Sequence, residues 1–469
     1  MDLVGLLFAL LLPYAIGDAL LAACVANGRA WREPGLVPWL AGAAWIVGSF
    51  ALTLVMRANA MAGVPFSLPS IGVPGLAIVA AAGFVAWRRN RDGWRDGLGD
   101  AFGGLMAHDL GRAARIAWFV LLAWLSLRAA MLLVEVVSKP IYPWDAWSAW
   151  ATKAKAYFAA RTIVPFGDES AWATAPTAIW FDAAPGQPAT LPLLQTWIAT
   201  AMGRFDDARV TLPWWFAFVA MMLVVYGETR RRGVAPLPSL AAAWFAGSMP
   251  LMGTQVALAG YADLLLAAAF ALGALAGLRA VRTREPVDVV AALFALAAVA
   301  SMKVAGWAWI VAVLPGLAAT ALPPAWTRRI AIGLVAAVAA VVAVAARFTD
   351  VAIGPVSLAF DPSYSTLAAD GLLLANWHLL ALGVVGTIAF AWRRLLGPDL
   401  GGLTLVVAAC AGWIALLAAF PWLRAWGADG LGLNRAVLVA APVVVTWMVV
   451  ALQDAGAARS MPAPAEAGS

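Results

Sequence analysis

Apolar runs of similar length recur along the entire sequence. A helix needs about 20 apolar residues to cross the hydrocarbon core of a bilayer, and we count about thirteen runs close to that length. They lie at residues 3–23, 36–55, 71–88, 114–137, 210–228, 236–252, 255–280, 287–301, 304–322, 329–347, 371–391, 400–420 and 435–452. This pattern predicts an all-α polytopic integral membrane protein with lipid around its helices.

The composition excludes the main soluble classes. Apolar residues make up 64% of the chain and charged residues 12%, too little polar surface to cover so much apolar chain. A disordered chain, a disulfide-stapled secreted domain and a cytosolic enzyme are therefore excluded. Cys24 and Cys410 lie far apart in apolar runs, so we expect them to be inert core residues.

The basic residues predict the topology. The net charge is +6, but arginines dominate and cluster at every second junction between apolar runs, a pattern of cytoplasmic loops rather than of nucleic-acid binding. The clusters are Arg88/Arg89/Arg91/Arg95, Arg230–Arg232, Arg279/Arg282/Arg284, Arg328/Arg329 and Arg393/Arg394. We therefore expect the N-terminus outside and the C-terminus in the cytoplasm. The first run holds Asp18 and has no basic segment before it, so we expect a retained helix.

A long external loop is predicted at 138–209. Residues 189–203 are apolar but too short to span, which favours a juxtamembrane or re-entrant helix. Residues 144–160 are predicted to form a second helix, lying at the membrane interface. The loops near 350–370 and 421–434 also fall outside.

The start of this loop carries the most distinctive motif, PIYPWDAWSAWATKAKAYF at 140–158. Trp144, Trp147, Lys153 and Lys155 suit an aromatic belt with lysines reaching toward the headgroups. Asp145 does not fit that interpretation, because a carboxylate between two tryptophans has no anchoring role. A general base acting on a lipid-borne substrate would lie at this depth.

Three further charged residues lie at the predicted outer ends of spans. Asp263 follows Tyr261 in GYADL, and is either a functional acid or a charge that stabilises a helix N-terminus. Lys303, in SMKVAGW, and Arg435, in an Asn-Arg pair, suit binding of a lipid phosphate or ordinary boundary positions. Together with Asp145 they outline a pocket for an anionic lipid and a hydroxyl acceptor.

These motifs resemble bacterial polytopic glycosyltransferases of the GT-C superfamily, akin to protein mannosyltransferases and lipid A aminoarabinose transferases. WDAWSAWATKAK resembles the stretch after the first core span of that superfamily, where an aspartate is catalytic, so the resemblance gives Asp145 this role. GYADLLLAAAF resembles its second acidic motif, and SMKVAGW resembles its lysine-containing turn, which Lys303 matches. The resemblance covers about 114–452.

The resemblance implies inverting transfer of a sugar from a polyprenyl-phosphate donor to a hydroxyl of a glycan, lipid or protein. Asp145 would deprotonate the acceptor, and Asp263 would position it or help to hold a divalent cation. Lys303, Arg435 and Lys153 would bind the phosphate, and Trp144, Trp147, Lys155 and Tyr261 would contact the substrate. Val304, Ala305 and the segment QPATLPLLQ at 187–195 lack the polar residues of the family's motifs.

The predicted organisation has accessory transmembrane helices at 1–90, a catalytic region at 114–452 and a disordered cytoplasmic tail at 456–469. The expected location is a bacterial inner membrane, with the site on the extracytoplasmic face. A flippase or transporter of a lipid-linked sugar is the main alternative, although its polar groups should lie near mid-membrane. A noncatalytic scaffold, whose loop binds a partner, is a further alternative. No nucleotide-binding motif is present.

Overall fold

The computed structural model describes residues 2–25, 31–90, 110–175, 179–347, 352–353, 356–357, 360, 376–420 and 431–460. Within these residues, nine helices are long and apolar enough to cross a membrane, and three apolar helices are shorter. Helices suit the bilayer because they satisfy every backbone hydrogen bond within one segment. The chain is therefore an all-α, multi-pass membrane protein, and the count of about thirteen spans stays a prediction.

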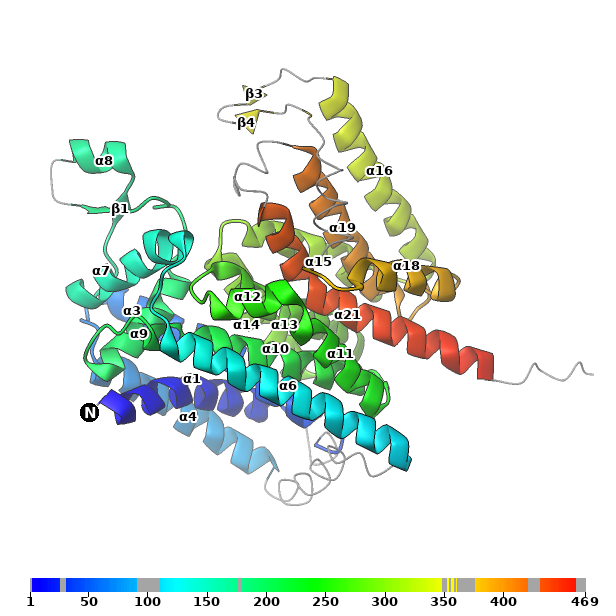
Figure 1. The fold of residues 1–469 in the computed structure, drawn as a ribbon, viewed down its shortest axis with the longest axis horizontal. Helices are drawn as coiled ribbons and strands as arrows, with labels where there is room; N and C mark the ends of the chain where they lie inside the picture. The colour runs from blue at the N-terminus through cyan, green and yellow to red at the C-terminus, as the bar shows by residue number, and fades with distance from the viewer. Residues whose placement is uncertain are drawn as a thin grey trace, which may run out of the picture.

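The long helices form one bundle (Figure 1). They are α1 (Asp2–Cys24), α3 (Leu36–Met61), α4 (Leu68–Asn90), α6 (Arg112–Ser138), α10 (Leu212–Arg231), α13 (Ala262–Thr283), α16 (Ala325–Arg347), α19 (Gly401–Ala419) and α21 (Leu431–Ser460). The shorter apolar helices are α14 (Pro286–Met302), α15 (Gly306–Ala321) and α18 (Leu380–Ala391).

The centre of the bundle is α13, which is rich in alanine and contacts α10, α14, α15 and α21. Small side chains allow neighbouring helices to approach closely when the hydrophobic effect does not drive their association. α6 and α16 instead expose most of their apolar surface, which we expect lipid to cover.

The prediction that residues 236–252 form a single spanning helix is wrong. It is divided into α11 (Pro236–Ser248) and α12 (Pro250–Ala257) by Met249, whose backbone is extended because a proline follows it. Arg128 of α6 donates hydrogen bonds to the carbonyls of Gly247, at 2.8 Å, and Met249, at 3.3 Å. The next predicted span, 255–280, also begins later than expected, at Ala262.

The segment predicted to be an external loop, 138–209, which keeps that name below, holds most of the short elements. They are the π-helix η1 (Ala146–Ala151), α7 (Thr152–Ala160), β1 (Phe166–Gly167), α8 (Glu169–Thr174), β2 (Trp180–Phe181), α9 (Thr190–Met202) and the 3-10 helix η2 (Arg209–Thr211). In β1 and β2, which are parallel, Phe166 pairs with Trp180 and Gly167 with Phe181. The predicted interfacial helix at 144–160 is thus a π-helix continued by an α-helix.

The second predicted juxtamembrane helix is α9, at the expected place but buried nearly throughout, packed on α1 and α7. A second two-stranded sheet, β3 (Ala352–Ile353) with β4 (Val356–Ser357), is antiparallel, with Ala352 opposite Ser357 and Ile353 opposite Val356.

The first three helices share one apolar core with the rest of the bundle. α3 packs on α10, and α1 packs on α9 and α14. Whether they are accessory in function stays a prediction. At the other end of the chain, α21 continues to Ser460, so the tail predicted from Gly456 begins as helix, and residues 461–469 lie outside the described part.

Several arginines form ion pairs at or near helix ends. Arg279 pairs with Glu33, Arg282 with Asp399 at 3.3 Å, and Arg394 with Asp454 at 3.2 Å. These arginines all belong to the predicted cytoplasmic clusters. Arg91 and Arg95, of the first cluster, lie outside the described residues.

Candidate functional site

Four charged side chains from distant parts of the sequence form one cluster. A nitrogen of Arg435 lies 2.8 Å from a carboxylate oxygen of Asp145, and its Nε lies 3.7 Å from Asp263. The ammonium of Lys303 lies 2.7 Å from the other oxygen of Asp263. The order Asp145–Arg435–Asp263–Lys303 alternates in charge, so each carboxylate has at least one cationic partner.

Each member comes from the end of a helix. Asp145 immediately precedes η1, Asp263 lies in the first turn of α13, Lys303 follows the last residue of α14, and Arg435 lies near the start of α21. Helix ends collect charge because the central turns are surrounded by apolar groups. The packing of α13 on α14 and α21 then brings these ends together.

A close backbone contact sets the distance between the two acidic segments. Gly260 has φ of 125°, and a Cβ built there would lie 2.4 Å from the Cβ of Ala146. Only glycine fits both this conformation and this spacing. The indole of Trp214 also donates to the carbonyl of Tyr261 at 2.6 Å. The loop before Asp263 is therefore held against the start of η1.

The start of α21 and the Lys303 turn have their own supports. Trp377, which is buried, donates to the side-chain oxygen of Asn434 at 2.9 Å and so positions the residue next to Arg435. Gln187 of the external loop accepts a hydrogen bond from the Val304 N–H at 3.3 Å. The sequence did not mark Trp214, Trp377 or Gln187 as supports, because an indole or an amide that bonds across the fold leaves no spacing pattern.

The two acids differ in access. The side chain of Asp145 is 42% exposed, whereas that of Asp263 is 4% exposed. Asp145 can therefore reach a substrate, while Asp263 is committed to Lys303 and Arg435. The guanidinium of Arg435 also lies over the Tyr261 ring, 4.7 Å from its centroid, and its Nε is buried with no hydrogen-bond partner among the described residues.

The side chain of Lys153 is buried and holds part of the external loop in place. Its ammonium is buried, donates to the carbonyls of Ala184 at 2.7 Å and Gln187 at 3.1 Å, and lies 3.6 Å from Asp182. Burial lowers the pKa of Lys153, opposed by Asp182, and burial raises the pKa of Asp182. These contacts hold Lys153 against the external loop rather than the charged cluster, so the phosphate-binding role predicted for it is not supported by this geometry.

The other predicted residues of the substrate loop are more exposed. Trp144 and Trp147, on either side of Asp145, pack edge to face with ring centroids 4.9 Å apart. Both rings are exposed, so they could contact a ligand of Asp145. Lys155 pairs with Asp207 at 3.0 Å on the surface, and its ammonium lies over Phe205.

A divalent cation would need several oxygen ligands. Among the described residues, no group of three or more His, Cys, Asp or Glu side chains is placed to hold a metal ion. In the charged cluster, Arg435 contacts both carboxylates.

No family model, no curated protein and no solved structure matches this chain.

Proposed function

We propose that this protein is an inverting glycosyltransferase that uses a polyprenyl-phosphate-linked sugar and an acceptor hydroxyl. The observation that carries the proposal is an exposed carboxylate, Asp145, that pairs with Arg435 in a cluster that also holds Lys303, at one end of an apolar helical bundle. A lipid-linked phosphate would approach such a site from the bilayer. The resemblance of the surrounding motifs to GT-C enzymes supports the same assignment.

In the proposed reaction, Asp145 accepts the proton of the acceptor hydroxyl. The acceptor oxygen forms a bond to the anomeric carbon as the bond from that carbon to the phosphate oxygen breaks, and polyprenyl phosphate leaves. A general base contributes about 10²- to 10⁴-fold to the rate. Lys303 and Arg435 would stabilise the charge that grows on the leaving phosphate.

Asp263 has a supporting role in this proposal. It contacts both cations and is nearly inaccessible, so it holds Lys303 and Arg435 in place rather than touching the acceptor. The exposed Trp144 and Trp147 flank the base and offer apolar faces to a sugar or a lipid chain. The proposed location is the extracytoplasmic face of a bacterial inner membrane.

A lipid-linked-sugar flippase would use the same ligand chemistry. Its binding groups are expected near the midplane of the bilayer, whereas Asp263 lies in the first turn of α13. This position favours a reaction at the membrane surface over passage through the bundle.

The test is sugar transfer or release from a panel of radiolabelled polyprenyl-phosphate sugars by the purified full chain in detergent. Wild type should turn over at least one donor, and Asp145→Asn should lose about 100-fold or more of that rate. Asp207→Asn, which changes an external carboxylate paired with Lys155, is the matched control and should remain active.

Equal turnover of Asp145→Asn and wild type, with both folded, would remove Asp145 from the mechanism. Saturable donor binding without turnover by either protein would contradict a transferase and favour the flippase.

A further inference from the structure

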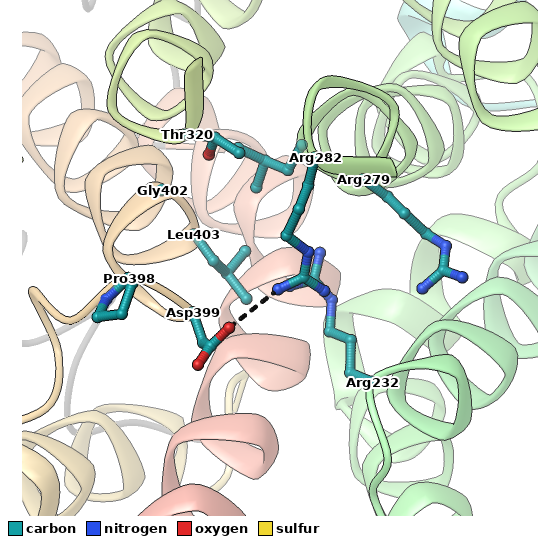
Figure 2. Close-up of a pocket in the computed structure, with 9 residues that line it drawn as sticks. Arg232, Arg279, Arg282, Thr320, Pro398, Asp399, Gly402 and Leu403 are labelled. Carbon is teal, nitrogen blue, oxygen red and sulfur yellow. Dashed lines mark hydrogen bonds and ion pairs between the residues drawn. The ribbon is translucent and has the colours of Figure 1, made fainter. Parts of the chain in front are cut away.

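A second polar site lies at the opposite end of the bundle from the charged cluster. It is a pocket lined by Arg232, Arg279, Arg282, Thr320, Asp399 and Gly402 (Figure 2). Asp263 and Arg279 lie at opposite ends of α13, about 24 Å apart at the helical rise of about 1.5 Å per residue. The pocket is therefore too far away to share a ligand group with the cluster.

Arg232 brings free donors into this pocket. Its side chain is 7% exposed, and its Nε donates to Glu228 at 2.7 Å. Its two terminal nitrogens have no hydrogen-bond partner among the described residues. Figure 2 shows the Arg232 side chain pointing toward Arg282. Unused guanidinium donors that line an open pocket are available to an acceptor there.

The other two arginines differ in how firmly they are held. Arg279 is fixed by Asp288, at 3.1 Å, and by Glu33. Within the described part of the chain, Arg282 bonds only to Asp399, at 3.3 Å, and these side chains are 42% and 80% exposed. Arg232 and Arg279 also repel the charge of Arg282. Because an exposed ion pair contributes little stability, a ligand anion can replace Asp399 at small cost.

The start of α19 adds a further positive element. No side chain caps this helix of 19 residues. The N–H of Gly401 bonds to Gly397 and that of Thr404 to Leu400, which leaves the N–H groups of Gly402 and Leu403 without an acceptor among the described residues. Both residues line the pocket. Unpaired N–H groups at a helix N-terminus bind anions.

We propose that this pocket binds a phosphate group, carried either by the headgroup of an anionic phospholipid or by free phosphate. Arg232 and Arg282 donate to the phosphate oxygens, the N–H groups of α19 complete the shell, and Asp399 turns out to solvent. Glu228, Asp288 and Glu33 do not line the pocket, so they hold the arginines without repelling the ligand directly. Guanidinium groups suit phosphate because their planar forks bond it bidentately.

The experiment measures ligand binding to the delipidated full chain in neutral detergent by native mass spectrometry. The probes are dioleoyl phosphatidylglycerol, dioleoyl phosphatidylcholine and inorganic phosphate. Phosphatidylglycerol should bind saturably and more tightly than phosphatidylcholine, whose choline cation meets the arginines. Arg282→Gln should weaken this binding about tenfold, as expected for a lost charged hydrogen bond. Arg88→Gln, an exposed arginine of α4, should not.

Asp399→Asn should change lipid binding in the opposite direction from Arg282→Gln. A gain in binding could not result from misfolding. This substitution removes the competing carboxylate and should tighten binding about threefold, whereas Asp454→Asn, which alters another exposed pair at the same end, should not. If inorganic phosphate binds saturably and Arg282→Gln weakens that binding, free phosphate is the natural ligand of the pocket. Binding of no probe, or equal binding by Arg282→Gln and wild type, would overturn the proposal.

Discussion

Arg435 and Asp145 are 290 residues apart in the sequence, and their side chains bond at 2.8 Å. The same guanidinium lies 3.7 Å from Asp263. One arginine therefore connects the external loop with the central helix of the bundle. Its planar fork presents donors along two edges, which a point-like ammonium cannot do.

Arg435→Lys tests whether the fork matters. We expect a loss of at least about tenfold in the transfer rate, because lysine keeps the charge but cannot contact both carboxylates in the same geometry. The measurement is turnover of the donor that wild type uses, together with thermal unfolding in detergent. Arg88→Lys, on the exposed face of α4, is the control. Unchanged turnover in Arg435→Lys would show that charge alone is sufficient.

Replacing Lys303 alone should lower the stability of the protein more than replacing Lys303 and Asp263 together. Lys303→Met leaves the buried carboxylate of Asp263 with Arg435 alone, and losing one partner of a buried pair costs about 3–5 kcal/mol. Adding Asp263→Asn should recover part of that loss. Denaturant unfolding in detergent measures both changes. Additive losses in the double variant would mean that the two side chains do not interact.

Gly260→Ala should disturb the site without altering any charge. The added methyl group would overlap Ala146, and the left-handed backbone adds strain. We expect a lower unfolding temperature and weaker donor turnover. Gly63→Ala separates the two effects, because Gly63 also has positive φ but nothing lies within 4 Å of its Cβ position. If both variants lose the same stability, strain alone explains the effect.

Lys153 and Lys155 offer a matched comparison in one helix. Lys153→Met removes the donor that holds the carbonyls of Ala184 and Gln187, so the external loop should be cleaved faster in limited proteolysis. Lys155→Met removes only an exposed pair and should leave the cleavage rate near that of wild type. Equal rates for all three proteins would contradict a structural role for Lys153.

We predict that the protein loses stability at alkaline pH because Tyr157 is buried. Burial raises its pKa from 10.0 to about 12, partly opposed by Arg57. The folded state therefore favours neutral Tyr157, and this contribution is complete below pH 10 and lost as the pH rises toward 12. Tyr157→Phe should lose less stability over this range in thermal unfolding. A pH profile identical to that of wild type would contradict this.

The sequence predicted which residues lie at the same end of the bundle. Asp145, Asp263, Lys303 and Arg435 each follow or precede an apolar run, and a charged group is costly within the run. Alternation of the runs then assigns all four to one end. Their lateral meeting could not be predicted, because hydropathy gives the depth of a residue but not which helices are neighbours.

Local departures from the prediction have definite causes. Residues 236–252 carry no charged side chain, so hydropathy did not separate α11 from α12. The break depends on Pro250 and on Arg128, which bonds the carbonyls of Gly247 and Met249. Lys153 was expected to face headgroups, but it lies in a helix that follows the π-helical turn of η1 and points into the external loop.

The sequence by itself determined a multi-pass helical membrane protein and the ends at which its charges lie, because both follow from the cost of placing polar groups in lipid. The tertiary structure decided which charges meet. The contact of Gly260 with Ala146 and the packing of α21 on α13 bring Arg435 between two carboxylates. Such contacts depend on how side chains interlock between helices, and no periodicity within a single segment contains that information.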